Sequence, residues 1–103
     1  MINAPGLLLA ARKAYPTFYV NAEPMEIAEF DGLILARAAY ALGMGTLRHV
    51  GLDRGSGLDQ ATDRIERRFM EHREMVVSSD AFQGLPDEEQ SRIERELFEV
   101  EVP

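Results

Sequence analysis

Apolar residues recur three and four positions apart along the second quarter of the chain, which is the spacing of one helix face. Pro24 suits the first helical position and Glu26 suits the positive end of the helix dipole, so we expect a helix to begin near residue 24. Asp31-Gly32 predicts a break or kink within it, and Gly43-Met44-Gly45 predicts its end. The face that this helix is expected to bury consists of Ile27, Phe30, Ile34, Ala38 and Ala41 or Leu42.

A second amphipathic stretch predicts an antiparallel helical hairpin in the C-terminal half. Ser56 with Asp59 three residues later has the pattern of a capping box, so the first helix is expected over about 57–77. Ser78-Ser79-Asp80 predicts a stop and a restart, and Pro86 followed by three acidic residues predicts a last helix that reaches Phe98 or Glu99. The short connection makes these two helices antiparallel neighbours. Their apolar stripes are Leu58, Ala61, Ile65, Phe69 and Met75 to Val77 in the first, and Ile93, Leu97 and Val100 in the second.

The N-terminal segment predicts one more helix, over about 4–15. Asn3 is a suitable N-cap, Pro5 is tolerated in the first turn, and Pro16 disfavours helix at the residue before it. The β-branched and aromatic run at 17–20 is too short for more than an extended connector or one short strand, and we prefer the connector. The pattern as a whole predicts an all-α fold of about four helices.

Length and composition favour one domain over residues 1–103. A chain of this length fits a single core, which we divide into a helical pair at 1–45, a Gly-rich connector at 46–57 and the helical hairpin at 58–100. The absence of cysteine excludes disulfides and thiolate sites, so packing alone must hold the fold, and self-association would help a domain this small. The N-terminus lacks the features of a signal peptide and no stretch is apolar enough to span a bilayer, so we expect a cytoplasmic protein without membrane contact.

Charge is uneven along the chain. The net charge is −7, and residues 78–103 carry eight acidic residues against two arginines. Duplex nucleic acid is bound largely through Lys and Arg, so direct nucleic-acid binding is not expected. The acidic end could instead bind a basic protein groove, even by imitating nucleic-acid phosphates. A solvated acidic face is the simpler interpretation.

Few residues could carry chemistry. Only two histidines are present and neither belongs to a metal-binding motif, so we expect no metal and no cofactor. His72 is expected at the edge of an apolar stripe rather than as a ligand or base. The connector before the helix at 57 has glycines that could cradle an anion, but it matches no phosphate-loop motif, and a flexible loop is the simpler interpretation. If a small anionic ligand binds, its candidate residues are Arg48, His49, Arg54 and Ser56.

A second set of residues could contact a protein partner. Tyr15 and Tyr19, close to Pro16, could form an exposed aromatic patch for a partner, although a plug that closes the core is the commoner arrangement. The remaining candidates are the acidic residues of the last helix and tail, namely Asp87, Glu88, Glu94, Glu99 and Glu101.

The stretch from Phe69 to Arg73 and from Ser79 to Gln90, with Ile93 and Leu97 after it, resembles the closing hairpin of small bacteriophage and prophage proteins, which share a pattern like F-x-x-L-P-x-x-E. The resemblance covers about a third of the chain. It implies a phage or mobile-element origin, action in the host cytoplasm, and a role in binding and modulating other proteins. It transfers no site residue.

The leading hypothesis is therefore a non-enzymatic interaction protein, expected to be a homo-oligomer, that binds a host or phage protein through helix faces and its acidic end. Two alternatives remain open. One is a module that sequesters a small ligand or nucleotide with the Gly-rich connector, as an anti-defence protein would. The other is an acidic nucleic-acid mimic that inhibits a DNA-binding or defence protein. An enzyme is not expected, because no nucleophile–base pair or metal set is visible.

Overall fold

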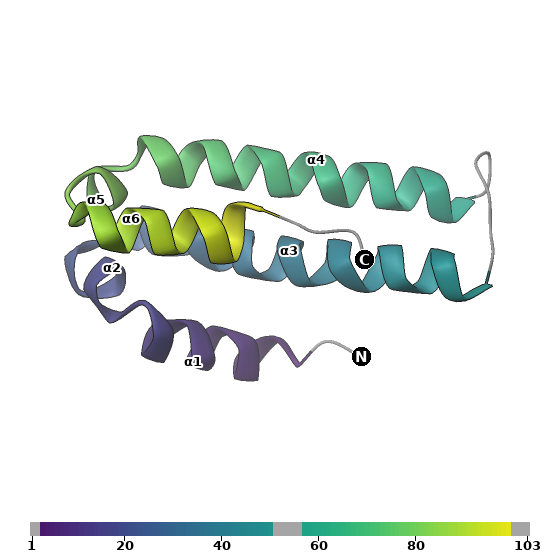
Figure 1. Cartoon of the computed structure of the whole chain (residues 1–103), viewed down its shortest axis with the longest axis horizontal. Coiled ribbons are helices and arrows are strands. Elements are labelled where there is room, and N and C mark those ends of the chain that lie inside the picture. The colour runs from purple at the N-terminus through teal and green to yellow at the C-terminus, as the bar shows by residue number, and fades with distance from the viewer. Residues whose placement is uncertain (1–2, 51–56, 100–103) are drawn as a thin grey trace.

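The computed structural model of the chain describes the backbone of residues 3–50 and 57–99 and, within these ranges, the side chains outside 43–50 and 57–62. The described part is helical and contains no strand, which confirms the all-α prediction, although the helices number more than four. In chain order, the elements in Figure 1 are α1 (Ala4–Ala14), α2 (Pro16–Asn21), α3 (Pro24–Val50), α4 (Gly57–Ser78), α5 (Asp80–Gln83), α6 (Asp87–Ile93) and the π-helical turn η1 (Glu94–Phe98).

Helix α1 begins as the sequence predicts. The Asn3 side chain accepts a hydrogen bond from the backbone N–H of Gly6, as an N-cap should. The expected connector or strand at 17–20 is wrong, because these residues form α2. Pro16 is the first residue of α2, where a proline needs no N–H partner and its fixed φ suits the helix, and Tyr15 makes the turn from α1 with φ −128° and ψ 53°. The proline thus ends one helix and starts the next.

Helix α3 is longer than the sequence predicts. It begins at Pro24, as expected, but it continues past Gly43 and Gly45 to Val50 and is not interrupted at Asp31-Gly32. The residues 46–50, which we assigned to the Gly-rich connector, are therefore helical. A glycine inside a helix costs roughly 1 kcal/mol against alanine, and tertiary packing readily exceeds that cost. Here α3 packs along α4 in the most extensive contact between any two helices of the described chain.

The C-terminal segment turns back where predicted. Ser79 accepts a hydrogen bond from the N–H of Phe82 and so caps the short helix α5, and Pro86 precedes α6. Gln90 holds this turn together, because its side-chain amide donates to the carbonyls of Phe82, Gln83 and Leu85. Figure 1 shows α6 running antiparallel to α4, which confirms the hairpin. Helix α4 makes its most extensive contact with α3, however, and not with α6.

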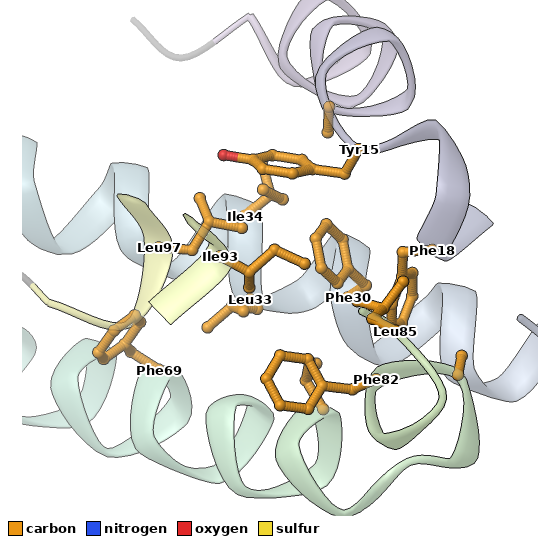
Figure 2. Packing of buried hydrophobic residues seen from close by; sticks show 13 residues of the cluster. Tyr15, Phe18, Phe30, Leu33, Ile34, Phe69, Phe82, Leu85, Ile93 and Leu97 are labelled. Atoms are coloured by element: carbon orange, nitrogen blue, oxygen red, sulfur yellow. The ribbon is translucent and has the colours of Figure 1, made fainter. Parts of the chain in front are cut away.

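One hydrophobic cluster draws residues from all six helices. Helix α6 lies in front of the α3–α4 pair in Figure 1. Ile93 of α6 and Leu97 of η1 reach into the space between α3 and α4 (Figure 2). On the other side of the cluster the rings of Tyr15, Phe18 and Phe30 meet, with Phe18 and Phe30 at a centroid distance of 4.3 Å. The fully buried side chains are Phe18, Phe30, Leu33, Val76 and Ile93.

Candidate functional site

The predicted anion-binding residues are not brought together by the described part of the structure. Arg48 and His49 belong to the last turns of α3, and their side chains lie outside the described residues, as do Arg54 and Ser56 altogether. The hypothesis of a ligand site in the connector therefore stays a prediction. The structure changes one part of this hypothesis, because Arg48 and His49 lie in a helix and not in the predicted loop.

The two predicted partner-binding tyrosines close the core. Tyr15 is only 7% exposed, so of the two alternatives the plug that closes the core describes it, and its hydroxyl donates to Oε1 of Glu96 at 2.9 Å. Tyr19 is partly buried and donates to Oδ1 of Asp31 at 2.8 Å. Each ring also lies under an arginine, with Arg92 4.7 Å from the Tyr15 centroid and Arg12 4.8 Å from that of Tyr19. These contacts tie α1 and α2 to α3 and to the C-terminal turn.

The burial and the hydrogen bonds of Tyr15 and Tyr19 predict at which pH these two hydroxyls ionise. Burial, together with the hydrogen bond to Glu96, raises the pKa of Tyr15 from 10.0 to about 12, and burial with the bond to Asp31 raises the pKa of Tyr19 still further. Because the folded state disfavours the tyrosinates, this contribution to stability is complete below pH 10 and is lost as the pH rises towards 12. We expect an alkaline absorbance titration of the folded protein to show that Tyr15 and Tyr19, two of its three tyrosines, ionise only well above pH 10.

The control is the same titration in denaturant, where the tyrosines should ionise near their ordinary pKa of 10. Tyr15→Phe should remove the component that titrates near pH 12 and leave the later one. Coincident titrations of the folded and the denatured protein would contradict the buried placement of these hydroxyls.

The predicted acidic residues lie on the outside of the last turns. Asp87, Glu88, Glu94 and Glu99 are exposed, and Glu101 lies outside the described residues. The neighbouring acids Glu89 and Glu96 form ion pairs within the chain, with Arg92 at 3.2 Å and 3.4 Å respectively. The described acidic surface is therefore a set of separate, solvated carboxylates, and its role in binding stays a prediction.

A different feature is a surface that runs along helices α3 and α4. Two grooves lie along the pair of helices α3 and α4, and no residue of α6 or η1 lines either of them. The groove at one end has a volume of about 280 Å³ and lies among Met25, Glu26, Glu29, Met75, Ser78, Ser79 and Asp80. The next groove has a volume of about 300 Å³ and lies among Gly32, Leu35, Ala36, Ala39, Ile65, Arg68 and His72. We call this surface the open face.

The open face exposes apolar side chains. Met25 is 79% exposed and Met75 51%, which is unusual for large apolar residues that lie opposite each other along a groove. Small residues form the floor of the second groove on the α3 side. Such a combination of flexible thioethers and small residues is adaptable to the shape of another helix.

His72 sits at the junction of the two grooves. Its Nδ1 is 2.8 Å from Oε2 of Glu29, and its ring covers Gly32 so closely that a Cβ at that position would lie 2.5–2.8 Å from three ring atoms. Only glycine leaves room for the imidazole there. His72 and Glu29 thus join α3 to α4.

Glu26 organises the end of the open face. Its Oε1 accepts from the N–H of Glu23 at 2.8 Å and its Oε2 accepts from the N–H of Ala81 at 3.1 Å, so one carboxylate caps α3 and contacts the start of α5. The N–H donors of Glu23 and Ala81 favour the ionised form and lower the pKa of Glu26 below 4.5. The carboxylate is therefore charged at neutral pH.

The charges along the open face are segregated. The groove between Met25 and Met75 is lined by three carboxylates, those of Glu26, Glu29 and Asp80. The groove further along is lined by Arg68 and His72 and by no acid. The sequence pattern does not predict this face, because it assigns Met75 to the apolar stripe of its helix. The spacing of 25, 29, 32, 36 and 39, alternately four and three residues, was the available indication.

Among the described residues, no group of three His, Asp or Glu side chains is arranged to hold a metal ion, and no helix is both long and apolar enough to cross a membrane. No protein-family model, curated protein or solved structure matches the chain.

Proposed function

We propose that this protein is a non-enzymatic interaction module that binds another polypeptide, through the open face of α3 and α4. The single observation that carries the proposal is the pair of exposed methionines, Met25 and Met75, on either side of a groove whose continuation is lined by Gly32, Ala36 and Ala39. Exposed apolar surface of this kind, bordered by charged residues, is typical of a protein-binding site.

The geometry favours a helical polypeptide as the bound element. A helix laid along the line between α3 and α4 would bring its side chains into both grooves, as ridges fit into grooves in helix packing. The grooves are open and shallow, whereas a small-molecule site encloses most of its ligand in a concave pocket. Binding of a polypeptide therefore uses the described surface better than binding of a nucleotide does.

The acidic side of α6 supports a second, independent hypothesis. Asp87, Glu88 and Glu94 are exposed and could contact a basic protein, including one that normally binds nucleic acid. Origin from a phage and action in the host cytoplasm belong to the same hypothesis and rest on the resemblance of the C-terminal segment.

Photocrosslinking tests the proposal at the open face. A crosslinking amino acid in place of Met75, in the full-length protein inside the producing cells, is expected to give a discrete covalent adduct with a polypeptide. The matched control is the same amino acid in place of Leu9, which is 57% exposed on α1 and outside the open face. Adducts from position 9 but none from position 75 would refute the proposal.

A further inference from the structure

The groove between Met25 and Met75 owes its apolar character to these two side chains. The other described residues that line it are polar or acidic, namely Glu26, Glu29, Ser78, Ser79 and Asp80. The two thioethers therefore supply most of the apolar contact that this part of the open face can make with a bound polypeptide.

Both thioether side chains are open to solvent. Met25 is 79% exposed and Met75 51%. The third described methionine, Met70, is 41% exposed on α4 but lines neither groove. The side chains of the other two methionines, Met1 and Met44, lie outside the described residues. A peroxide molecule in solution can therefore reach the methionines on both walls of the groove.

Reaction with a peroxide changes a thioether from apolar to polar. The sulfur takes one oxygen atom from hydrogen peroxide, so the O–O bond breaks, a sulfur–oxygen bond forms and water leaves. The sulfur is oxidised and the peroxide is reduced. The sulfoxide is polar, and methionine sulfoxide reductases convert it back to the thioether. Oxidation on both walls would thus remove the apolar surface of the groove reversibly.

The fold does not depend on these two side chains. Neither Met25 nor Met75 belongs to the hydrophobic cluster, and on α4 the neighbouring residue Val76 is the one that is buried. A polar atom on an exposed side chain needs no partner within the protein, because water satisfies it. Oxidation should therefore change the surface of the folded protein and leave its core intact.

We propose that Met25 and Met75 form a peroxide-sensitive modification site, and that their oxidation to sulfoxides prevents the open face from binding a polypeptide. This inference rests on the proposed function and adds the regulation of that site. A sulfoxide cannot be buried against a partner as a thioether can, so each oxidised methionine is expected to weaken binding about tenfold.

The first test needs no partner. The purified full chain is treated with hydrogen peroxide, and mass spectrometry of its peptides follows the oxidation of each methionine in the folded and in the urea-denatured protein. Met25 and Met75 should react nearly as fast in the folded protein as in the denatured one, and the melting temperature should change by less than about 4 °C. Strong protection of either methionine, or unfolding on oxidation, would overturn the inference.

The second test measures binding. A crosslinking amino acid replaces Ser78, which is exposed and lines the same groove, so both methionines stay in place. The purified protein is oxidised, freed of peroxide and irradiated in an extract of the producing cells. The adduct that the unoxidised protein forms should fall about tenfold or more in yield, and treatment of the oxidised protein with methionine sulfoxide reductases should restore it.

Variants at the methionines assign the effect. Met70→Leu is the matched control, and peroxide should still abolish the adduct of this variant. The double variant Met25→Leu/Met75→Leu has no thioether in the groove, so peroxide should not change its yield of adduct. A full yield from the oxidised unchanged protein, or a loss on oxidation of the double variant, would overturn the inference and leave the proposed function standing. Absence of any adduct from the unoxidised protein would refute both.

Discussion

Replacing Phe30 by alanine is expected to lower the free energy of unfolding by about 3–5 kcal/mol, the usual loss for a buried phenylalanine. Phe30 is fully buried and lies at the centre of the aromatic cluster, with its ring centroid 4.3 Å from that of Phe18, 5.3 Å from Tyr19 and 5.6 Å from Tyr15. Removal of the ring therefore leaves a cavity and also takes away the packing partner of three other rings. Small domains have only about 5–15 kcal/mol of stability in total.

Urea unfolding followed by circular dichroism measures this loss, as a lower midpoint at an unchanged slope. Leu9→Ala is the control, because Leu9 is 57% exposed and its truncation should change the free energy of unfolding by less than about 0.5 kcal/mol. A loss below about 1 kcal/mol for Phe30→Ala would mean that the four rings do not form the centre of the core.

The starts of helices were predictable because the chemistry that fixes them is local. Asn3 caps α1, Pro24 begins α3, and Ser79 caps α5, all at the positions that the sequence indicates. In each case the residue satisfies or removes a backbone N–H within three positions of itself. Such interactions do not depend on the rest of the fold, and they can be recognised without it.

The end of α3 and the existence of α2 were not predictable in the same way. Gly43 and Gly45 lower the helix propensity, but the long contact between α3 and α4 stabilises the helix through both positions. Residues 17–20 have the composition of a strand, yet the described chain contains no strand with which they could pair. They form a helix that buries Phe18 instead. Tertiary packing decided both cases against local propensity.

The candidate site was harder to predict than the fold. Periodicity identified Met75 as part of an apolar stripe, but periodicity does not predict which residues of the stripe a third helix will cover. Helix α6 covers the side of α4 that carries Phe69 and Val76 and leaves Met75 exposed. Likewise, the contact between Glu29 and His72 joins residues that are 43 positions apart, and only the pairing of α3 with α4 brings them together.

The position of α6 therefore determines which surface stays open, and Ile93 is the residue that fixes it. Ile93 is fully buried between α3 and α4, together with Leu33 and Leu97 (Figure 2). Replacing Ile93 by alanine is expected to lower the free energy of unfolding by about 2–5 kcal/mol. Helix α6 has only seven residues, too few to persist alone in water, so its amides should lose more protection from hydrogen exchange than those of α3 and α4.

Hydrogen exchange measured by mass spectrometry, together with urea unfolding, separates the two parts of this prediction. Arg95→Ala is the matched control, since Arg95 is exposed in the same segment and its truncation should change neither quantity appreciably. Equal loss of protection in all helices would mean that α6 unfolds only with the whole chain. A loss of stability below about 1 kcal/mol would contradict the placement of Ile93 in the core and, with it, the reason why α6 occupies one side of the α3–α4 pair and leaves the other open.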